Sequence, residues 1–283
     1  MANNRVYSPE RDSSEHIKAL LNDSIHGICF SPYIEGQEPG SDITEAQIEA
    51  RLSILKPHVS WIRTFSCSEG NELIPAVAKR MGFKTLVGAW LDEDLDKNQE
   101  EIDTAIAMAK AGEIDLLAVG NEVLLREELT DDQLADYINY AKKEAGIPVG
   151  YVDAYYLFEN FPKVADACDV IMANCYPFWE GIGIEHAHVY MRDMYYRAVN
   201  AGKGKPVIVS ETGWPNKGTA FGAAIPNDAN AKQYFLQTAT WTESLGIPLF
   251  YFSSFDEDWK VGDEGDVGAY WGLWDKSGKP KFW

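Results

Sequence analysis

With 283 residues, 46% of them hydrophobic, the chain is long enough to bury one large core, and (β/α)8 barrels commonly occupy about 250 residues as a single unit. Its 44 acidic residues outnumber its 25 basic residues, and the formal net charge of −19 argues against nucleic acid as a partner. No run approaches the roughly 18 consecutive apolar residues of a membrane span, and the polar start lacks a signal-peptide pattern.

The chain is predicted to divide into a short leader and one barrel. We expect residues 1–24 to form a leader with a short helix near His16 to Leu21 that covers the bottom of the barrel. Residues 25–283 are expected to form the barrel domain, because no change in composition marks an inter-domain linker. The last forty residues or so contain no ninth strand and helix, so they are expected to form a long loop after the eighth strand.

Eight short apolar runs recur along the chain, and helical patterns separate them. Fully apolar strands that alternate with amphipathic helices predict an α/β fold with a parallel sheet buried on both faces. Eight such units close as a (β/α)8 TIM barrel, and no G-x-G-x-x-G after the first run supports a dinucleotide-binding sheet. The expected strands are 25–30, 59–65, 84–90, 114–120, 147–152, 169–176, 206–211 and 247–252, and the longer helices are 43–56, 98–111, 130–144, 186–200 and 228–245.

Two glutamates lie at predicted strand ends, where barrels of this kind place their catalytic side chains. Glu122 follows the fourth strand in A-V-G-N-E-V, and Glu211 ends the seventh in V-S-E-T-G-W-P. An isolated carboxylate near an apolar core is costly unless it is paired or its pKa shifts, so each is either in a structural ion pair or functional. Because both strands end at the barrel mouth, we expect the two carboxylates to converge.

Two facing carboxylates about 5 Å apart suit a double displacement on a sugar: one attacks the anomeric carbon, and the other protonates the leaving oxygen and later activates water. Their environments must separate their pKa values. Arg63, at the end of the second strand in W-I-R-T-F, is the candidate for keeping the attacking carboxylate ionised.

The motifs V-G-N-E-V and V-S-E-T-G-W-P resemble the signatures of glycoside hydrolase family 17, the β-1,3-glucanases and related transglucosylases of clan A. The resemblance spans about residues 25–274. It implies that Glu122 is the acid/base and Glu211 the nucleophile. It also implies that Asn121 holds the 2-hydroxyl of the sugar at the cleavage point and that Tyr176 hydrogen bonds the nucleophile.

The resemblance extends to the end of strand eight, where F-D-E-D-W-K-V-G-D-E is similar to a cluster of charged residues in the family. In this chain the matching residues are Glu257, Lys260 and Glu264. Three further motifs are closer to the bacterial branch of the family than to the plant enzymes: S-P-Y near the start, G-A-W-L-D and Y-W-G-L-W. Strand-end aromatic rings can stack on the C–H face of glucose, whereas Trp61, Trp241 and Trp271 are expected to be packing. The remaining candidate substrate contacts are Tyr33, Trp90, Asp153, Phe178, Trp179, Trp214, Phe255 and Trp259.

No metal and no cofactor are expected. The D-x-D-x-D run from Asp92 resembles a calcium loop, but Lys97 stands where its turn needs glycine. His186 and His188 have no evident third ligand. The cysteines lack zinc-binding spacing and are expected to be buried thiols, with a disulfide as the alternative; they are Cys29, Cys67, Cys168 and Cys175.

The leading functional prediction is a retaining, endo-acting hydrolase of β-1,3-glucans such as laminarin. A transglucosylase with the same glycosyl-enzyme is the second enzyme hypothesis, and a non-catalytic glucan-binding protein is the hypothesis from a different class. The presence of both glutamates argues against the last. We expect the partner to be a neutral β-glucan polysaccharide or oligosaccharide and the protein to be a monomer that is secreted, periplasmic or surface-anchored.

Overall fold

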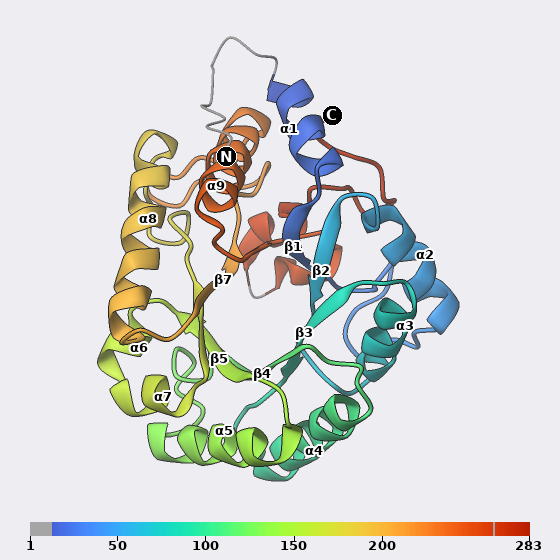
Figure 1. Cartoon of the computed structure of the whole chain (residues 1–283). Coiled ribbons are helices and arrows are strands. Elements are labelled where there is room, and N and C mark those ends of the chain that lie inside the picture. Colours follow the sequence, from blue (N-terminus) through green and yellow to red (C-terminus); the bar gives the residue numbers. More distant parts are fainter. Residues whose placement is uncertain (1–12, 263) are drawn as a thin grey trace.

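The computed structural model describes residues 13–262 and 264–283, and its strands close into a barrel (Figure 1). Eight parallel strands follow one another around the barrel in chain order, and β8 pairs back onto β1 through Gly27 with Phe250 and Ile28 with Tyr251. The predicted single-domain (β/α)8 barrel is therefore confirmed. In the described part of the chain, every helix is too short or too polar to cross a membrane.

The strands are short and mostly buried on both faces, which explains why they are continuous apolar runs in the sequence. Every residue of β6 and β7 is buried. All eight begin within two residues of the predicted starts. They are β1 Ile25–Cys29, β2 Val59–Arg63, β3 Lys84–Ala89, β4 Leu116–Asn121, β5 Val149–Ala154, β6 Val170–Asn174, β7 Val207–Thr212 and β8 Leu249–Tyr251.

The helices form a ring around the strands (Figure 1). The five long helices match the predicted ones, while α3, α6 and α7 were not predicted because they are only four to seven residues long. The ring contains α2 Glu45–Leu55, α3 Ile74–Arg80, α4 Leu95–Lys110, α5 Asp131–Ala145, α6 Leu157–Asn160, α7 Pro162–Ala167, α8 Ile184–Ala201 and α9 Asp228–Leu245.

Polar side chains define where several of these helices begin. Thr130 and Gln133 form the predicted capping box of α5. Asp94 caps α4 by accepting hydrogen bonds from the N–H groups of Asp96 and Lys97, so the D-x-D-x-D run is a helix start. Across residues 13–262 and 264–283, no three His, Cys, Asp or Glu side chains lie together as metal ligands would.

The predicted leader helix is present as α1, Ser13–Asn22, and is longer than expected. It packs alongside α9 in the outer ring (Figure 1), with Ile17, Leu20 and Leu21 buried. The carbonyl of Leu21 lies 3.3 Å from Nδ1 of His58, just before the start of β2. The helix therefore packs beside the outer ring, next to the start of β1, and residues 1–12 of the predicted leader lie outside the described residues.

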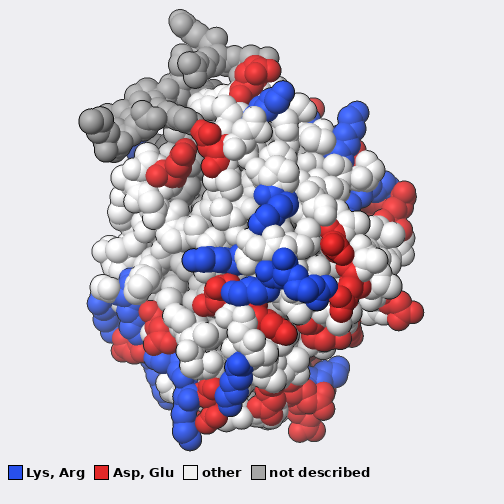
Figure 2. All heavy atoms as spheres, turned by 45° about the vertical axis from the view of Figure 1, so that its right-hand side comes forward, with Lys and Arg blue, Asp and Glu red and all other residues white. Residues whose placement is uncertain are grey.

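After β8 the chain forms the predicted long loop, which includes the 3-10 helices η2 (Asp258–Val261) and η3 (Gly265–Tyr270). The N–H of Trp274 donates to the carbonyl of Ser254 at 2.9 Å, so the loop returns to the end of β8. Elsewhere, all four cysteines are buried free thiols, as predicted. On the face in Figure 2, basic side chains lie among acidic ones. Ion pairs also join neighbouring helices, as Arg80 of α3 does with Glu45 of α2 at 2.6 Å.

Candidate active site

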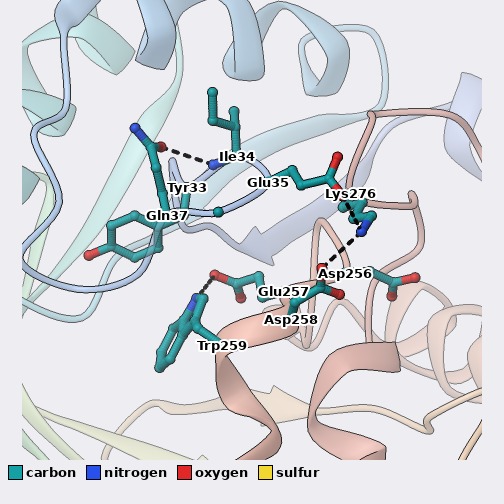
Figure 3. Close-up of a pocket in the computed structure, with 10 residues that line it drawn as sticks. Tyr33, Ile34, Glu35, Gln37, Asp256, Glu257, Asp258, Trp259 and Lys276 are labelled. Carbon is teal, nitrogen blue, oxygen red and sulfur yellow. Dashed lines mark hydrogen bonds and ion pairs between the residues drawn. The ribbon is translucent and has the colours of Figure 1, made fainter.

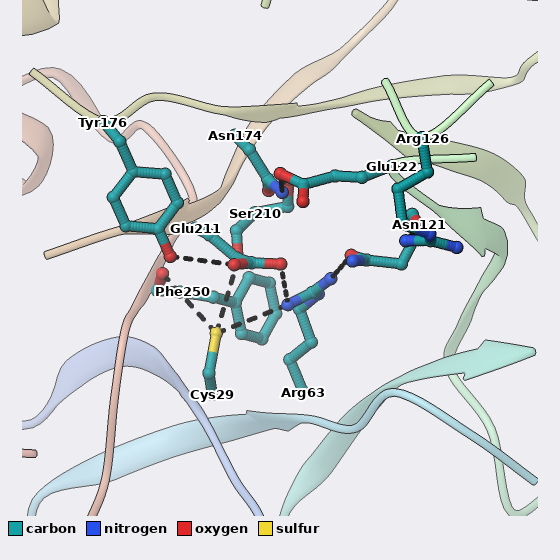
Figure 4. Close-up of polar contacts among 10 residues, drawn as sticks. All are labelled: Cys29, Arg63, Asn121, Glu122, Arg126, Asn174, Tyr176, Ser210, Glu211 and Phe250. Carbon is teal, nitrogen blue, oxygen red and sulfur yellow. Dashed lines mark hydrogen bonds and ion pairs between the residues drawn. The ribbon is translucent and has the colours of Figure 1, made fainter. Parts of the chain in front are cut away.

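Glu122 and Glu211 meet at the mouth of the barrel with side chains from β1, β2 and β6 (Figure 4). Glu211 lies within β7 and is 6% exposed, and Glu122 directly follows β4. Their carboxyl groups face the same central space in Figure 4. The polar ends of separate strands are thus assembled into one site by barrel closure.

The backbone at Glu122 adopts a conformation that non-glycine residues rarely take. Its φ is +54°, and Gly120, two residues earlier, has a φ of +85°. A Cβ at position 120 would lie 2.8 Å from Cγ2 of Val123, so the turn requires glycine there. Strained backbone of this kind persists where the surrounding structure holds it in place, and it is concentrated at functional sites.

Glu122 has the environment of a general acid. Nδ2 of Asn174 donates a hydrogen bond to its Oε1 at 2.8 Å, and Oδ1 of Asn174 accepts one from Ser210 at 2.8 Å. Burial, followed by the negative charge of Glu211, raises the pKa of Glu122 to about 7, and the Asn174 hydrogen bond offsets only part of this. Near neutral pH the carboxyl group can therefore either give or take a proton.

Glu211 is surrounded by groups that stabilise an anion. Nη1 of the buried Arg63 lies 2.7 Å from its Oε1, and the hydroxyl of Tyr176 donates to its Oε2 at 2.8 Å. Burial and then the charge of Glu211 raise the pKa of Tyr176 well above its usual value, so the phenol remains a donor. Burial alone would lower the pKa of Arg63, but the charge of Glu211 reverses this and the pKa is raised.

Arg63 also orients Asn121, since its Nη2 donates to Oδ1 of Asn121 at 2.7 Å. The amide NH2 of Asn121 is therefore left to donate elsewhere. Below Arg63, the thiol of Cys29 lies 3.5 Å from Nη1 and donates to the carbonyl of Ser210. Burial raises the pKa of Cys29 to about 12, which keeps the thiol neutral.

The residues after β8 form a second polar cluster near Glu211. Nζ of Lys260 is 2.7 Å from Oε2 of the buried Glu257, and Nε1 of Trp259 donates to Oε1 of Glu257 at 3.1 Å. Burial raises the pKa of Glu264 to about 7; the charge of Lys260 opposes this shift, while those of Glu211 and Glu257 add to it. The strand-eight cluster thus adjoins the candidate nucleophile.

A small, open pocket continues from this cluster toward the loop after β1 (Figure 3). The ring of Tyr33 meets that of Trp259 edge to face at 6.0 Å, and both line the pocket with Glu257. At its outer side, Lys276 pairs with Glu35 at 2.6 Å. Tyr33, Trp259 and Glu257 are therefore brought together as one polar and aromatic surface.

The predicted aromatic contacts divide into two groups. Trp90 and Trp179 are half-buried on the rim, and Trp179 lies 5.8 Å from Phe221 between ring centres. Three others have no exposed ring face, because other aromatic rings and Arg51 cover them, and this placement does not fit the predicted stacking role. These are Phe178, Trp214 and Phe255, which are 0%, 1% and 2% exposed.

Asp153 also departs from the prediction. It is fully buried, accepts a hydrogen bond from the N–H of Ala154 at 2.7 Å and contacts the hydroxyl of Tyr151, so it does not face the cleft. Conversely, sequence reasoning missed Cys29 and Asn174 as members of the site. Asn174 is the last residue of β6, so the strand-end criterion that identified the glutamates would have found it.

Comparisons with known proteins identify the family to which the chain belongs. The sequence profile of the BtgE/BtgC glycoside hydrolase domain matches residues 27–272. A glucan 1,3-β-glucosidase of Saccharomyces cerevisiae is 30% identical over 269 residues, which cover 86% of this chain and 86% of the relative. The structure of a glycoside hydrolase family 17 β-1,3-glucanosyltransferase from Rhizomucor miehei is 30% identical, with a TM-score of 0.82 over 92% of this chain and 96% of that one.

A mutant of the Rhizomucor enzyme in complex with laminaritriose has a TM-score of 0.83 at 29% identity, over 92% of this chain and 96% of that one. An endo-laminarinase from Formosa Hel1_33_131 has a TM-score of 0.80 over 94% of this chain and 87% of that one, but at 20% identity it shows the shared fold alone. The expected closeness to the bacterial branch gains no support, since the glucosidases of Saccharomyces cerevisiae and Candida albicans, at 30% and 29% identity, are fungal. The matched profile and these relatives show that the chain belongs to the BtgE/BtgC glycoside hydrolase domain family, within glycoside hydrolase family 17, and is a glycoside hydrolase.

Proposed function

We propose that the enzyme is a retaining, endo-acting β-1,3-glucan hydrolase with Glu211 as nucleophile and Glu122 as acid/base. The observation that carries this proposal is the contrast between the two carboxyl groups. Glu211 is held by a cation and a phenol donor, and burial raises the pKa of Glu122 to about 7. Glycoside hydrolysis needs a pair of carboxyl groups in such different environments, one that can be protonated and one that stays ionised.

In the first step, a carboxylate oxygen of Glu211 attacks the anomeric carbon while protonated Glu122 gives its proton to the departing glycosidic oxygen. The C–O bond to the leaving sugar breaks, and an ester between Glu211 and the remaining sugar forms. In the second step, ionised Glu122 takes a proton from water as the water oxygen attacks the same carbon. Glu211 leaves as a carboxylate, and the two inversions give net retention.

Asn121 is proposed to hold the 2-hydroxyl of the sugar bound at Glu211. Arg63 already occupies Oδ1 of Asn121, so the amide is fixed with its NH2 available as a donor. Hydrogen bonds to the 2-hydroxyl strengthen in the transition state of glycoside hydrolysis and supply several kcal/mol. This assigns Arg63 a double task, since it contacts both Glu211 and Asn121.

The proposed substrate is a neutral β-1,3-glucan. Support comes from the names of the Saccharomyces glucosidase and of the Rhizomucor transferase with laminaritriose. The half-buried rings of Trp90, Trp179 and Trp259 supply flat surfaces at the mouth for sugar stacking. A polymeric substrate implies a protein that is secreted or attached to the cell surface, and a Candida albicans cell surface mannoprotein is 25% identical over 257 residues. We further propose a monomer with its catalytic barrel at residues 25–283.

A transglucosylase is the second candidate, favoured by the transferase at 30% identity. It would form the same ester on Glu211 but pass the sugar to a glucan acceptor instead of water. A protein that only binds glucan is disfavoured, because binding alone needs neither the raised pKa of Glu122 nor the Arg63 ion pair.

A hexamer of β-1,3-linked glucose, incubated at low and high concentration and analysed by mass spectrometry, tests the proposal. We expect shorter products at low concentration and a minor set of longer ones at high concentration. Products longer than six units that dominate even in dilute solution would establish transfer as the main reaction. Faster cleavage of a β-1,4-linked hexamer would contradict the proposed preference for β-1,3 linkages. Glu211→Gln is the matched control and should be inactive; turnover equal to that of the wild type would contradict the assignment of Glu211 as the nucleophile.

A further inference from the structure

Asp153, at the end of β5, is a buried acid to which the proposed mechanism gives no task. Its side chain contacts the hydroxyl of Tyr151, which in turn accepts a hydrogen bond from the N–H of Leu124 at 2.9 Å. Burial raises the pKa of Asp153 to about 6, although its hydrogen bonds with Tyr151 and with backbone N–H groups, including those of Leu124 and Leu125, oppose this shift. The acid is therefore directed at the turn that carries Glu122.

Arg126 holds the same turn through a separate set of contacts. Its guanidinium donates to the carbonyls of Asn121 and Leu91, and Nη2 also lies 2.6 Å from Oε2 of Glu128. The ring centre of Trp90 lies 4.6 Å from the same guanidinium. The side chain thus ties the end of β4 to the loop after β3, and Figure 4 shows it beside Asn121 and Glu122.

The turn that both groups contact contains the strained backbone of Glu122. The N–H of Arg126 donates to the carbonyl of Glu122 at 2.9 Å, and the N–H of Glu122 donates to that of Val152 at 2.8 Å. A non-glycine residue at φ +54° is stable only where its surroundings hold it. A proton donor must also stay within hydrogen-bond reach of the glycosidic oxygen, so a small movement of this turn would slow the reaction.

We propose that Asp153 and Arg126 are positioning residues, which hold the turn that carries Glu122 through separate contacts and apply opposite charges to its carboxyl group. The proposal rests on Glu122 being the acid/base of the proposed function. Asp153 acts through Tyr151 and the backbone N–H of Leu124. Arg126 acts through its hydrogen bonds to the carbonyls of Asn121 and Leu91. Neither side chain is required to touch the sugar.

The charges around Glu122 come from several elements. The charges of Glu211 in β7, Asp153 in β5 and Arg126 in its own turn act on its carboxyl group, while β6 contributes the neutral Asn174. The phenol of Tyr156, after β5, also lies within its influence. After burial and the charge of Glu211, Asp153 raises the pKa of Glu122 further and Arg126 lowers it. The two positioning residues therefore have effects of opposite sign.

These opposite signs give a measurable signature. Glu122 must be protonated in the first step, so activity falls as the pH rises through its pKa of about 7. Asp153, with a pKa of about 6, is mostly ionised above pH 7. Removing its charge lowers the pKa of Glu122 and moves the alkaline limb of the pH profile to lower pH. Removing the charge of Arg126 moves the same limb to higher pH.

The test measures kcat and KM for the β-1,3-linked hexamer from pH 5 to 9. We expect the alkaline limb of Asp153→Asn to move down by about one pH unit and that of Arg126→Gln to move up by about one unit. Arg126→Lys keeps the positive charge but loses the paired hydrogen bonds of the guanidinium. The alkaline limb of its pH profile should therefore stay in place, while kcat falls about tenfold and KM changes little. Asp103→Asn, in the exposed Tyr140–Asp103 pair at 2.9 Å, is the matched control and should behave as the wild type.

The proposal would be overturned if the alkaline limbs of Asp153→Asn and Arg126→Gln stay in place or move in the same direction. If Asp153→Asn does not fold, Arg126→Lys and Arg126→Gln carry the test, because the Arg126 side chain is partly exposed, at 28%. Glu122→Gln distinguishes a failure of the positioning roles from a failure of the proposed function. An inactive Glu122→Gln with unmoved limbs in the other variants contradicts only the positioning roles, whereas a fully active Glu122→Gln contradicts the proposed function itself.

Discussion

Replacing Glu122 by glutamine is expected to stabilise the folded protein at alkaline pH. The folded-state pKa of Glu122 is about 7, above its ordinary value of 4.5, mainly because burial disfavours the charged form. Below pH 4.5 the carboxyl group is protonated in both states. Between the two values the unfolded chain releases its proton first, so the free energy of unfolding falls as pH rises. Glutamine has a similar shape and no proton to release, so the variant avoids this loss.

The size of the effect follows from the two pKa values. The difference between about 7 and 4.5 is about 2.5 units, and each unit corresponds to about 1.36 kcal/mol. Partial titration leaves a gain of about 1 kcal/mol at pH 5, and the gain approaches about 3 kcal/mol at pH 8. For a chain of this size, 1 kcal/mol shifts Tm by roughly 2 °C, so Tm should rise by about 6 °C at pH 8.

Thermal unfolding of the wild type and Glu122→Gln at pH 5, 6.5 and 8 measures this gain. The exposed Glu49→Gln on α2 removes a carboxylate without burial and should show no such dependence on pH. A Glu122→Gln protein that is no more stable than the wild type at pH 8, or whose gain is the same at pH 5 and pH 8, would refute the reasoning that burial raises this pKa.

Three further outcomes are expected. Glu211→Gln should keep the fold but lower kcat at least 100-fold, because it loses covalent catalysis, as steady-state assays on laminarin would show. Arg63→Met should leave Glu211 as an unpaired buried carboxylate and lower the free energy of unfolding by about 3–5 kcal/mol in denaturant titrations; a loss below about 1 kcal/mol would contradict the ion pair. Activity should survive EDTA, and a loss that calcium reverses would require the acidic run at Asp92 to be reinterpreted.

The barrel and the two glutamates could be predicted because burial leaves a direct trace in the sequence. A strand buried on both faces must be apolar throughout, so Glu122 and Glu211 stand out where the runs end. The predicted contacts of Arg63 and Tyr176 with Glu211 are present at 2.7 and 2.8 Å. Each of these residues lies within two residues of a strand end, where the direction toward the mouth is set by barrel closure.

The orientation of loop side chains could not be predicted in the same way. Phe178 and Trp214 follow strands as Trp179 does, but they turn into the core and pack on each other at 5.3 Å. Position after a strand therefore says little about which rings remain exposed. Asp153 was misassigned for a related reason, since its partners are the Tyr151 hydroxyl and local backbone, and backbone groups have no signature in the sequence.

The most direct test of the two catalytic roles is the anomeric configuration of azide adducts formed by Glu122→Ala and Glu211→Ala from an aryl β-glycoside of β-1,3-linked glucose. With Glu122 removed, the activated aryl group leaves without acid help, Glu211 forms its ester, and azide displaces it to give a β-glycosyl azide. With Glu211 removed, azide attacks the sugar directly from the opposite face and gives an α-glycosyl azide. Proton NMR distinguishes the two products, and an α-azide from Glu122→Ala or a β-azide from Glu211→Ala would contradict the assignment of nucleophile and acid/base.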